Sequence, residues 1–207
     1  MPTSSTPPDP AGLPSAPQSS PTPSPHLSLE PATRADAELL ARLHAESWRH
    51  AYAGLVPVDY LEHQAAAERR ATWRARMEDD AEGPLEVTIA RVDGEAAGFA
   101  CLMPLAEPGY GIYLDNLHVL PAYHGQGLGK RLLAHCVRRV ATEWPGKALF
   151  LYVLADNEPA RGFYRALGGE ESEPFLEPFH GTDVMVPVLR VTWFDVDALL
   201  ARLTPRA

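Results

Sequence analysis

Residues 117–130 read LHVLPAYHGQGLGK and form the most informative segment of the chain. The apolar run from Ile112 to Leu120 predicts a strand that stops at Pro121. Beyond three closely spaced glycines, apolar residues recur at helical spacing from Leu128 to Trp144. The segment therefore predicts a strand, a tight turn and a helix in direct succession.

The glycine turn predicts a site for an anion. Glycines allow the backbone to turn sharply, and the start of a helix leaves several N–H groups without a partner. Together with the helix dipole, such groups attract negative charge, and phosphate is the natural occupant. A glycine-rich turn that binds no ligand is the alternative interpretation.

The spacing excludes two familiar phosphate loops. A Walker A loop requires a glycine further upstream of the Gly-Lys pair and Ser or Thr after it, but His124 and Arg131 occupy these positions. The dinucleotide-binding fingerprint requires a third glycine where Lys130 stands. We therefore expect neither a GTPase or kinase with a Walker A loop nor an NAD-dependent enzyme.

Strands and helices alternate along the rest of the chain. Asp93-Gly94 joins two strand-like runs, Leu85–Val92 and Ala96–Leu105, into an expected antiparallel hairpin. Residues 148–154 are apolar on both faces, which is typical of a buried central strand. The other expected elements are a strand at Leu27–Glu30, a helix capped by Thr33 or Asp36, a helical region at Val58–Glu78, a short helix at Pro159–Leu167, a strand at Val184–Trp193 and a terminal helix at Val196–Leu203.

Composition favours one globular domain with a tail. The chain has 207 residues, of which 45% are hydrophobic and 22% charged. Prolines are concentrated in residues 1–31, and the first basic residue is Arg34. Such a segment cannot bury enough apolar surface to offset the entropy of ordering it. We therefore expect residues 1–25 to be a disordered tail and residues 26–207 to be the folded domain.

Net charge and cysteine content limit which partners and which cellular compartment are expected. A formal net charge of -9 argues against nucleic acid or an anionic membrane as the main partner, and leaves cationic or neutral substrates open. No stretch reaches the roughly 20 apolar residues of a membrane span, and residues 1–26 lack the features of a signal peptide. The chain has only two cysteines, Cys101 and Cys136, and each lies in an apolar stretch, so a disulfide scaffold is excluded. We expect a cytoplasmic protein.

The glycine turn and its strand resemble motif A of the GNAT superfamily of N-acetyltransferases. That motif is an Arg/Gln-x-x-Gly-x-Gly/Ala run, preceded by a strand that ends in apolar-x-Val-x-Pro. The match departs at His124, where the family usually has Arg or Gln, although a neutral His still offers a hydrogen-bond donor.

Two further segments extend this resemblance. The run Asn157-x-x-Ala160-x-x-Phe163-Tyr164-x-x-x-Gly168 resembles motif B of the family, whose helix follows the central strand. The segment Leu29–Thr33 with Asp36 also resembles a GNAT start. Together the similarity covers residues 27 to about 195, which is essentially the whole chain after the expected tail.

The resemblance implies a fold and a cofactor. The fold is α/β, with a mixed, mostly antiparallel central sheet whose two parallel central strands splay apart, and with helices on both faces. Acetyl-CoA, the acyl donor, would lie in the resulting V, with its pyrophosphate on the N–H groups of the glycine turn and its pantetheine arm along the strand backbone. Asn157 would reach this arm or only cap the following helix. The residues implied in binding are Leu117, Val119, His124, Gly125, Gln126, Gly127, Leu128, Gly129, Lys130 and Asn157.

The implied reaction is attack of a primary amine on the thioester carbonyl. A lysine-like amine with a pKa of about 10.4 must lose a proton, which costs roughly 4.6 kcal/mol at neutral pH. The candidate bases are Asp115 and His118, acting directly or through water. Strand alternation places them on opposite faces, so only one is expected to reach the site, although a bulge could reverse this. Either residue could also be a polar strand residue with no catalytic part.

The candidate acid is Tyr164, which matches the motif B tyrosine. Its phenol could protonate the departing thiolate, or the ring could only pack against the sheet. A backbone N–H of the splayed strand would meet the oxyanion. We expect no metal, because the eight histidines show no ligand spacing.

Evidence on the acceptor is limited to two features. Four glutamates within Glu170–Pro178, the segment before the last strand, could steer a cationic amine or form only a solvated loop. Trp48, Tyr52, Trp73 and Phe175 could form an aromatic wall, although Trp48 and Trp73 at helical spacing also suit the core.

The sequence thus predicts an N-acetyltransferase that acts on an amine of a small molecule or peptide in a ternary complex. It predicts no nucleic-acid or membrane partner, and a homodimer is possible. The alternative is a non-catalytic acyl-CoA-binding or regulatory module on the same fold, which His124 in place of Arg or Gln keeps open.

Overall fold

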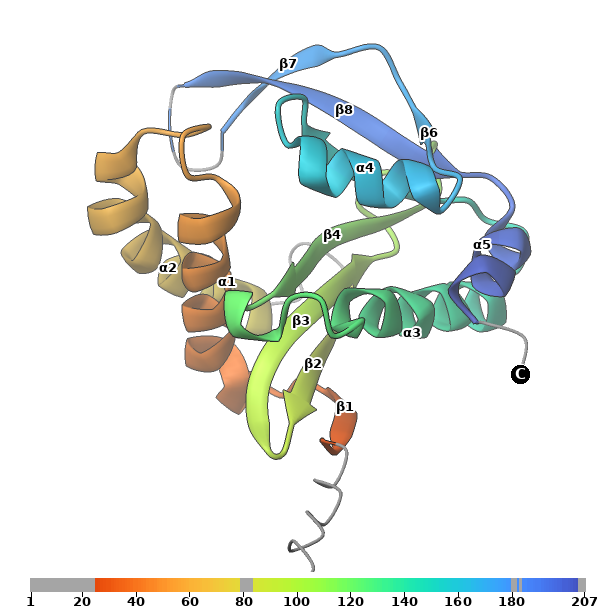
Figure 1. The fold of residues 1–207 in the computed structure, drawn as a ribbon, viewed down its shortest axis with the longest axis horizontal. Coiled ribbons are helices and arrows are strands. Elements are labelled where there is room, and N and C mark those ends of the chain that lie inside the picture. Colours follow the sequence, from red (N-terminus) through yellow and green to blue (C-terminus); the bar gives the residue numbers. More distant parts are fainter. Residues whose placement is uncertain (1–24, 79–83, 180–181, 183, 205–207) are drawn as a thin grey trace, which may run out of the picture.

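The computed structural model describes residues 25–78, 84–179, 182 and 184–204. Within these residues eight strands form one mixed sheet, drawn in Figure 1. They are β1 (Leu27–Pro31), β2 (Glu86–Val92), β3 (Glu95–Met103), β4 (Ile112–Val119), β5 (Leu149–Leu154), β6 (Glu170–Glu171), β7 (Phe175–Pro178) and β8 (Met185–Trp193). The strand order is β1-β2-β3-β4-β5-β8-β6, and β7 also pairs with β8. Residues 1–24, the expected tail, lie outside the described residues, so their disorder stays a prediction.

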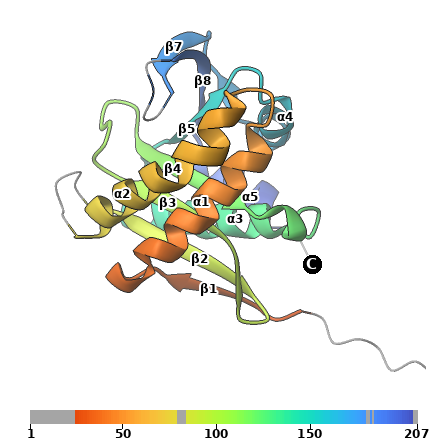
Figure 2. The same ribbon diagram turned by 90° about the vertical axis from the view of Figure 1, so that its left-hand side faces the viewer.

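Helices cover both faces of the sheet. The α-helices are α1 (Ala37–Ala51), α2 (Ala65–Glu78), α3 (Leu128–Glu143), α4 (Glu158–Ala166) and α5 (Val196–Leu203). Helices α1 and α2 lie side by side over one face (Figure 2), whereas α3, α4 and α5 pack on the other. A π-helix at Tyr60–Gln64 precedes α2, within the helical region expected there. The architecture is the mixed α/β fold that the resemblance implied.

Local sequence explains how the elements begin and turn. Asp93 and Gly94 adopt φ angles of 51° and 87°, which are the left-handed values that a two-residue hairpin needs. Both predicted caps are used: Thr33 is the N-cap of a 3₁₀ turn and Asp36 that of α1, and the backbone N–H and hydroxyl of Thr33 both donate to the Asp36 carboxylate, at 2.8 and 2.7 Å. The short 3₁₀ turn leads into α1.

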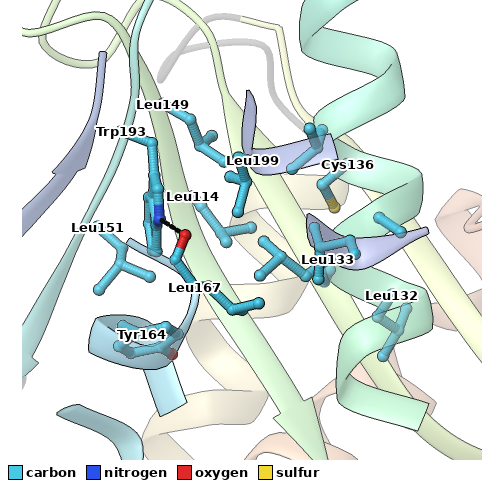
Figure 3. Packing of buried hydrophobic residues seen from close by; sticks show 14 of the residues in the cluster. Leu114, Leu132, Leu133, Cys136, Leu149, Leu151, Tyr164, Leu167, Trp193 and Leu199 are labelled. Carbon is cyan, nitrogen blue, oxygen red and sulfur yellow. Dashed lines mark hydrogen bonds between the residues drawn. The ribbon is translucent and has the colours of Figure 1, made fainter. Parts of the chain in front are cut away.

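Two apolar layers hold the helices to the sheet. The larger one lies between the sheet and α3, α4 and α5, and Figure 3 shows Leu133, Leu199 and Trp193 within it. There Trp193 Nε1 donates to the Leu167 carbonyl oxygen at 3.2 Å. The second layer lies under α1 and α2 and includes the fully buried Trp73. Trp73 is therefore a core residue and not part of an aromatic wall for the acceptor.

The central strands separate after a very short ladder. Strands β4 and β5 are the parallel pair of the sheet, and they pair only through Ile112 with Leu149 and Tyr113 with Phe150. Beyond these pairs each strand keeps its outer neighbour, β3 for β4 and β8 for β5, but not the other central strand. This confirms the splay that the resemblance implied.

The charge of the segment Glu170–Pro178 suggested a solvated loop, but the segment contains two short strands. Its ends form β6 and β7, which both pair antiparallel with β8. Strand β8 has nine residues, so its edge accommodates two short strands in succession. Strands of two and four residues carry too little periodic pattern to be predicted from sequence.

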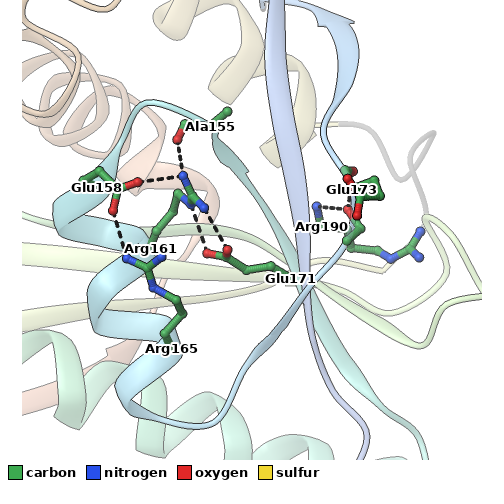
Figure 4. A network of polar contacts seen from close by, with 8 residues as sticks. Ala155, Glu158, Arg161, Arg165, Glu171, Glu173 and Arg190 are labelled. Carbon is green, nitrogen blue, oxygen red and sulfur yellow. Dashed lines mark hydrogen bonds and ion pairs between the residues drawn. The ribbon is translucent and has the colours of Figure 1, made fainter.

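One arginine ties α4 to this edge of the sheet. Arg161 donates to both carboxylate oxygens of Glu171 on β6, at 3.0 and 2.8 Å, and to the Ala155 carbonyl oxygen at 2.6 Å (Figure 4). It also pairs with Glu158 in the first turn of α4. The arginine lowers the pKa of Glu171 below its ordinary value. Helix α4, which carries Tyr164, is thus held at a fixed position.

Candidate active site

A cavity of about 790 Å³ opens where β4 and β5 separate. Its walls come from both strands, the glycine turn, the end of α1 and the start of α4. All the catalytic and cofactor-binding residues predicted from sequence line it except Gln126. Those that line it are Asp115, Leu117, His118, Val119, His124, Gly125, Gly127, Leu128, Gly129, Lys130, Asn157 and Tyr164.

The glycine turn presents its backbone to this cavity. Gly125 and Gly127 have φ angles of 75° and 76°, a conformation that costs other residues energy. Gly127 is the N-cap of α3 and supplies no side-chain acceptor, and the Arg131 N–H donates to its carbonyl oxygen at 3.1 Å. The preceding N–H groups of the first turn therefore have no intrahelical acceptor and suit a phosphate. Lys130 adds an exposed positive charge beside them.

The side chains of the turn are used within the protein. His124 Nε2 lies 2.9 Å from the Val119 carbonyl oxygen. A carbonyl oxygen only accepts, so Nε2 carries the hydrogen, and a neutral His124 has no second N–H for a ligand. The donor expected at this position is therefore already engaged. Gln126 likewise donates to the Ala122 carbonyl oxygen at 3.2 Å and does not line the cavity.

The backbone of β4 faces the gap at alternate residues. Leu120 N–H donates to the Ala97 carbonyl oxygen of β3 at 2.8 Å. Since backbone groups alternate in direction along an antiparallel pair, Leu117 and Val119 direct theirs away from β3, toward the gap. The same alternation applies on β5, where the Ala155 N–H donates to the Pro187 carbonyl oxygen at 2.9 Å. An extended ligand arm in the gap would meet backbone groups that no strand pairs, among which the Val119 carbonyl oxygen already accepts from His124.

A bulge in β4 changes which residues share a face. The register passes from Cys101 opposite Asn116 to Leu102 opposite Leu114, so Asp115 is an extra residue. Simple alternation predicted that Asp115 and His118 lie on opposite faces, and that prediction is wrong. Both face α1 and α2, because the bulge shifts the alternation by one position.

Asp115 forms a buried ion pair. Arg76 on α2 donates to Asp115 Oδ2 at 2.7 Å, and the two side chains are 12% and 6% exposed. The Tyr113 hydroxyl also bonds this carboxylate, and burial together with Asp115 raises the pKa of Tyr113 above its usual range. Asp115 is the acidic residue among the described residues that line the cavity.

His118 is held between two elements. Its Nδ1 lies 2.9 Å from the Ser47 hydroxyl of α1. Its ring packs on the rings of His44 and Phe99, with centroids 4.7 and 5.4 Å away. Burial lowers the pKa of His118 to about 4, and the nearby Asp115 opposes this shift only in part. The imidazole is therefore neutral at physiological pH.

Tyr164 faces the cavity from α4. The residue is 9% exposed, and burial raises the pKa of its phenol above the usual value, so the phenol is protonated at neutral pH. Tyr52, at the end of α1, lines the cavity as well, and burial raises its pKa to about 12. Asn157 is the N-cap of α4, where its Oδ1 accepts from the Ala160 N–H at 3.3 Å, and it also lines the cavity.

Sequence reasoning missed one wall of the site and placed other residues wrongly. Ser47 and His50 of α1 line the cavity although no motif includes them. Of the four aromatic residues suggested as an acceptor wall, only Tyr52 lines it. No glutamate of Glu170–Pro178 lines it, and Glu171 is paired with Arg161. The acidic segment therefore does not form the wall of this cavity.

The described residues include neither a metal-binding cluster nor a membrane-spanning helix. No group of three or more His, Cys, Asp or Glu side chains in the described part of the chain could hold a metal ion. Among the same residues, no helix has the length and apolar character needed to cross a membrane. Cys101 and Cys136 are free and buried.

Comparison with known proteins gives a consistent result. A family model described as Acetyltransferase (GNAT) family matches residues 40–168. The uncharacterized N-acetyltransferase YuaI of Bacillus subtilis is 27% identical over 84% of this chain and 96% of its own length. The bovine thialysine N-epsilon-acetyltransferase is 38% identical over 30% of this chain and 36% of its own. Among solved structures, the PaiA N-acetyltransferase of Thermoplasma acidophilum in complex with coenzyme A has a TM-score of 0.63 and 20% identity, over 81% of this chain and 99% of that chain.

Proposed function

The chain belongs to the acetyltransferase (GNAT) family and is an acetyl-CoA-dependent acyltransferase, and from this premise we propose that it acetylates a primary amine of a small molecule or peptide. The amine attacks the thioester directly, in a ternary complex. One observation carries the proposal: the cavity between the splayed strands joins the glycine turn, where an anion would bind, to the phenol of Tyr164. The cytoplasmic location and the homodimer stay predictions.

The donor is bound mainly by backbone. The first-turn N–H groups of α3 bind the pyrophosphate, and Lys130 adds its charge. The backbone groups of Leu117 and Val119 that face the gap bond the pantetheine arm, and Asn157 contacts the same arm from the start of α4. This arrangement tolerates His124 in place of Arg or Gln, because the phosphate does not depend on that side chain.

The leaving thiolate receives its proton from Tyr164. Collapse of the tetrahedral intermediate breaks the C–S bond, and the sulfur takes the electron pair. The raised pKa keeps Tyr164 protonated at neutral pH, so its hydroxyl is available to give a hydrogen bond or its proton to the sulfur as negative charge develops there. Burial within the α4 layer fixes the position of the phenol.

The amine proton is taken by Asp115, directly or through water. Asp115 and His118 both face the acceptor side of the cavity, so geometry does not separate them. Burial disfavours the charged imidazolium that His118 would become on accepting a proton, whereas Asp115 already carries negative charge. The carboxylate of Asp115 also attracts a cationic amine, and Arg76 holds it in position. The name of the bovine relative specifies acetylation of an ε-amine, which agrees with a primary amine as acceptor.

The proposal is tested with purified protein, acetyl-CoA and a panel of primary amines, with thiol release as the signal. We expect amine-dependent turnover, which Tyr164→Phe reduces by about 10²–10⁴-fold while the Kd for CoA measured by calorimetry stays the same. The matched control is Tyr110→Phe, which changes an exposed tyrosine outside the cavity. Tight CoA binding without turnover on any amine would instead support the non-catalytic module. Equal turnover of wild type and Tyr164→Phe would exclude Tyr164 as the acid.

A further inference from the structure

The Ser47–His118 hydrogen bond has a defined direction. Ser47 is 5% exposed, and this burial favours an acceptor within the protein for its hydroxyl hydrogen. In the described part of the chain its partner is His118 Nδ1 at 2.9 Å, and no bond to the carbonyl of the preceding helical turn is present there. A hydroxyl whose hydrogen has one available acceptor donates to it. Ser47 is therefore the donor and His118 Nδ1 the acceptor.

This direction fixes the tautomer of His118. A neutral imidazole carries one hydrogen, and when Nδ1 accepts, the hydrogen is on Nε2. Within the described residues Nε2 has no protein partner, and it is not among the atoms shielded from solvent. Because His118 lines the cavity, its Nε2–H opens onto the cavity.

The surroundings of the ring keep it in this orientation. The planes of His44 and Phe99 are inclined to the His118 plane by 37° and 36°, so the imidazole is packed against both rings. His44 is itself fixed, because Trp73 Nε1, which can only donate, bonds to His44 Nδ1 at 3.1 Å. A rotation of His118 would disturb this whole layer.

We infer that Ser47 is a positioning residue that fixes His118 as a neutral hydrogen-bond donor to the thioester oxygen. In this role His118 is not the base. The inference rests on the proposed acetyl transfer and adds to it the group that stabilises the oxyanion. Ser47 acts through His118 and does not touch the reacting atoms.

The chemistry follows from what an N–H group can do. It cannot take a proton from an ammonium group, but it can donate to an oxygen that gains negative charge. As the amine nitrogen bonds to the carbonyl carbon, the C=O electron pair moves to the oxygen, which accepts from His118 Nε2–H. When the C–S bond breaks, that pair reforms the carbonyl, the sulfur takes the proton of Tyr164, and the amine proton goes to Asp115 or water.

The tautomer can be measured without turnover. Long-range ¹H–¹⁵N correlation spectra of the labelled full chain distinguish a protonated ring nitrogen from an unprotonated one, and loss of a signal in His118→Gln assigns it. We expect a protonated Nε2 and an unprotonated Nδ1 in the wild type, and a mixture in Ser47→Ala. An unprotonated Nε2 in the wild type would overturn the inference. Because no substrate is present, this result does not depend on the proposed function.

Kinetics with matched variants test the role of the donor. His118→Gln keeps an amide N–H at a similar distance from the backbone but cannot act as a base, whereas His118→Ala keeps neither function. We expect turnover within about tenfold of wild type for the first variant and a loss of about 10²–10³-fold for the second, with unchanged CoA affinity. Equal loss in both variants would show that His118 is the base and overturn the inference.

Ser47 variants complete this set. We expect Ser47→Thr, which keeps the hydroxyl, to retain turnover, and Ser47→Ala to lose about tenfold in kcat with an unchanged KM for acetyl-CoA. Ser28→Ala on β1 is the control, since its hydroxyl bonds Glu30 and Ser28 does not line the cavity. Equal rates for Ser47→Thr and Ser47→Ala would overturn the positioning role. If the wild type acetylates no amine, the proposed function fails while the nitrogen spectrum still decides the tautomer.

Discussion

His118→Gln should remove a specific pH dependence of stability. In the folded protein His118 has a pKa of about 4, against a reference value of 6.5. Between these values the unfolded chain binds a proton that the folded chain does not, so stability falls as pH falls from 6.5 toward 4. A difference of 2.5 pKa units limits the effect to about 3 kcal/mol, and at pH 5 it amounts to about 2 kcal/mol. Glutamine does not titrate, so the variant lacks this loss.

The assay is urea unfolding of wild type and variant at several pH values between 8 and 5. At pH 8 His118 is neutral in the folded and the unfolded chain, so the free-energy difference between the two proteins reflects packing and hydrogen bonding. At pH 5 the wild type should have lost about 2 kcal/mol more than the variant, because the other titrating groups are common to both. His118→Asn, a second variant that does not titrate, separates protonation from packing. A difference between wild type and both variants that stays constant from pH 8 to pH 5 would refute the buried, neutral imidazole.

Two further substitutions test the turn and the anchor of α4. Gly127→Ala should cost about 1 kcal/mol in thermal unfolding, because φ is 76° while no atom lies within 4 Å of the new Cβ, and it should weaken CoA binding at least tenfold by calorimetry. Gly146→Ala, with φ of 79° and equally open space, should show the same stability loss with unchanged CoA affinity. Arg161→Met should lower the unfolding free energy by about 2 kcal/mol because it leaves half-buried acceptors unpaired, whereas Arg165→Met, which breaks an exposed pair with Glu158, should cost less than about 0.5 kcal/mol. Equal losses of CoA affinity in the two glycine variants, or equal losses of unfolding free energy in the two arginine variants, would contradict the assigned cause.

Periodicity and turn chemistry were sufficient to predict the elements around the site. The strand, glycine turn and helix over 112–144 were expected from apolar spacing and glycine position, and the structure has β4 and α3 there. The terminal helix was expected at Val196–Leu203, where α5 lies. These features depend on nearest neighbours in the sequence, which is why they can be predicted from it. Strands β6 and β7 depend instead on the edge that β8 offers, and that edge is not visible in their own residues.

The parts of the site that could not be predicted depend on distant partners. The bulge at Asp115 exists only in the register between β4 and β3, so alternation along β4 alone gave the wrong face. Ser47 precedes its partner His118 by 71 positions, and on an amphipathic helix a serine among core residues carries no signal of its own. The internal hydrogen bond of His124 likewise needs the fold of the turn. Motifs identified which residues meet, but not the direction in which each one donates.

The short ladder between β4 and β5 leaves the sheet as two halves that need another connection. Helix α3 follows β4 on one half, α5 follows β8 on the other, and these two helices pack against each other through residues such as Leu133 and Leu199 (Figures 1 and 3). This helix contact connects the two halves on the face that α3 and α5 cover. A smaller side chain at Leu199 would therefore change the affinity for acetyl-CoA, although Leu199 does not line the cavity.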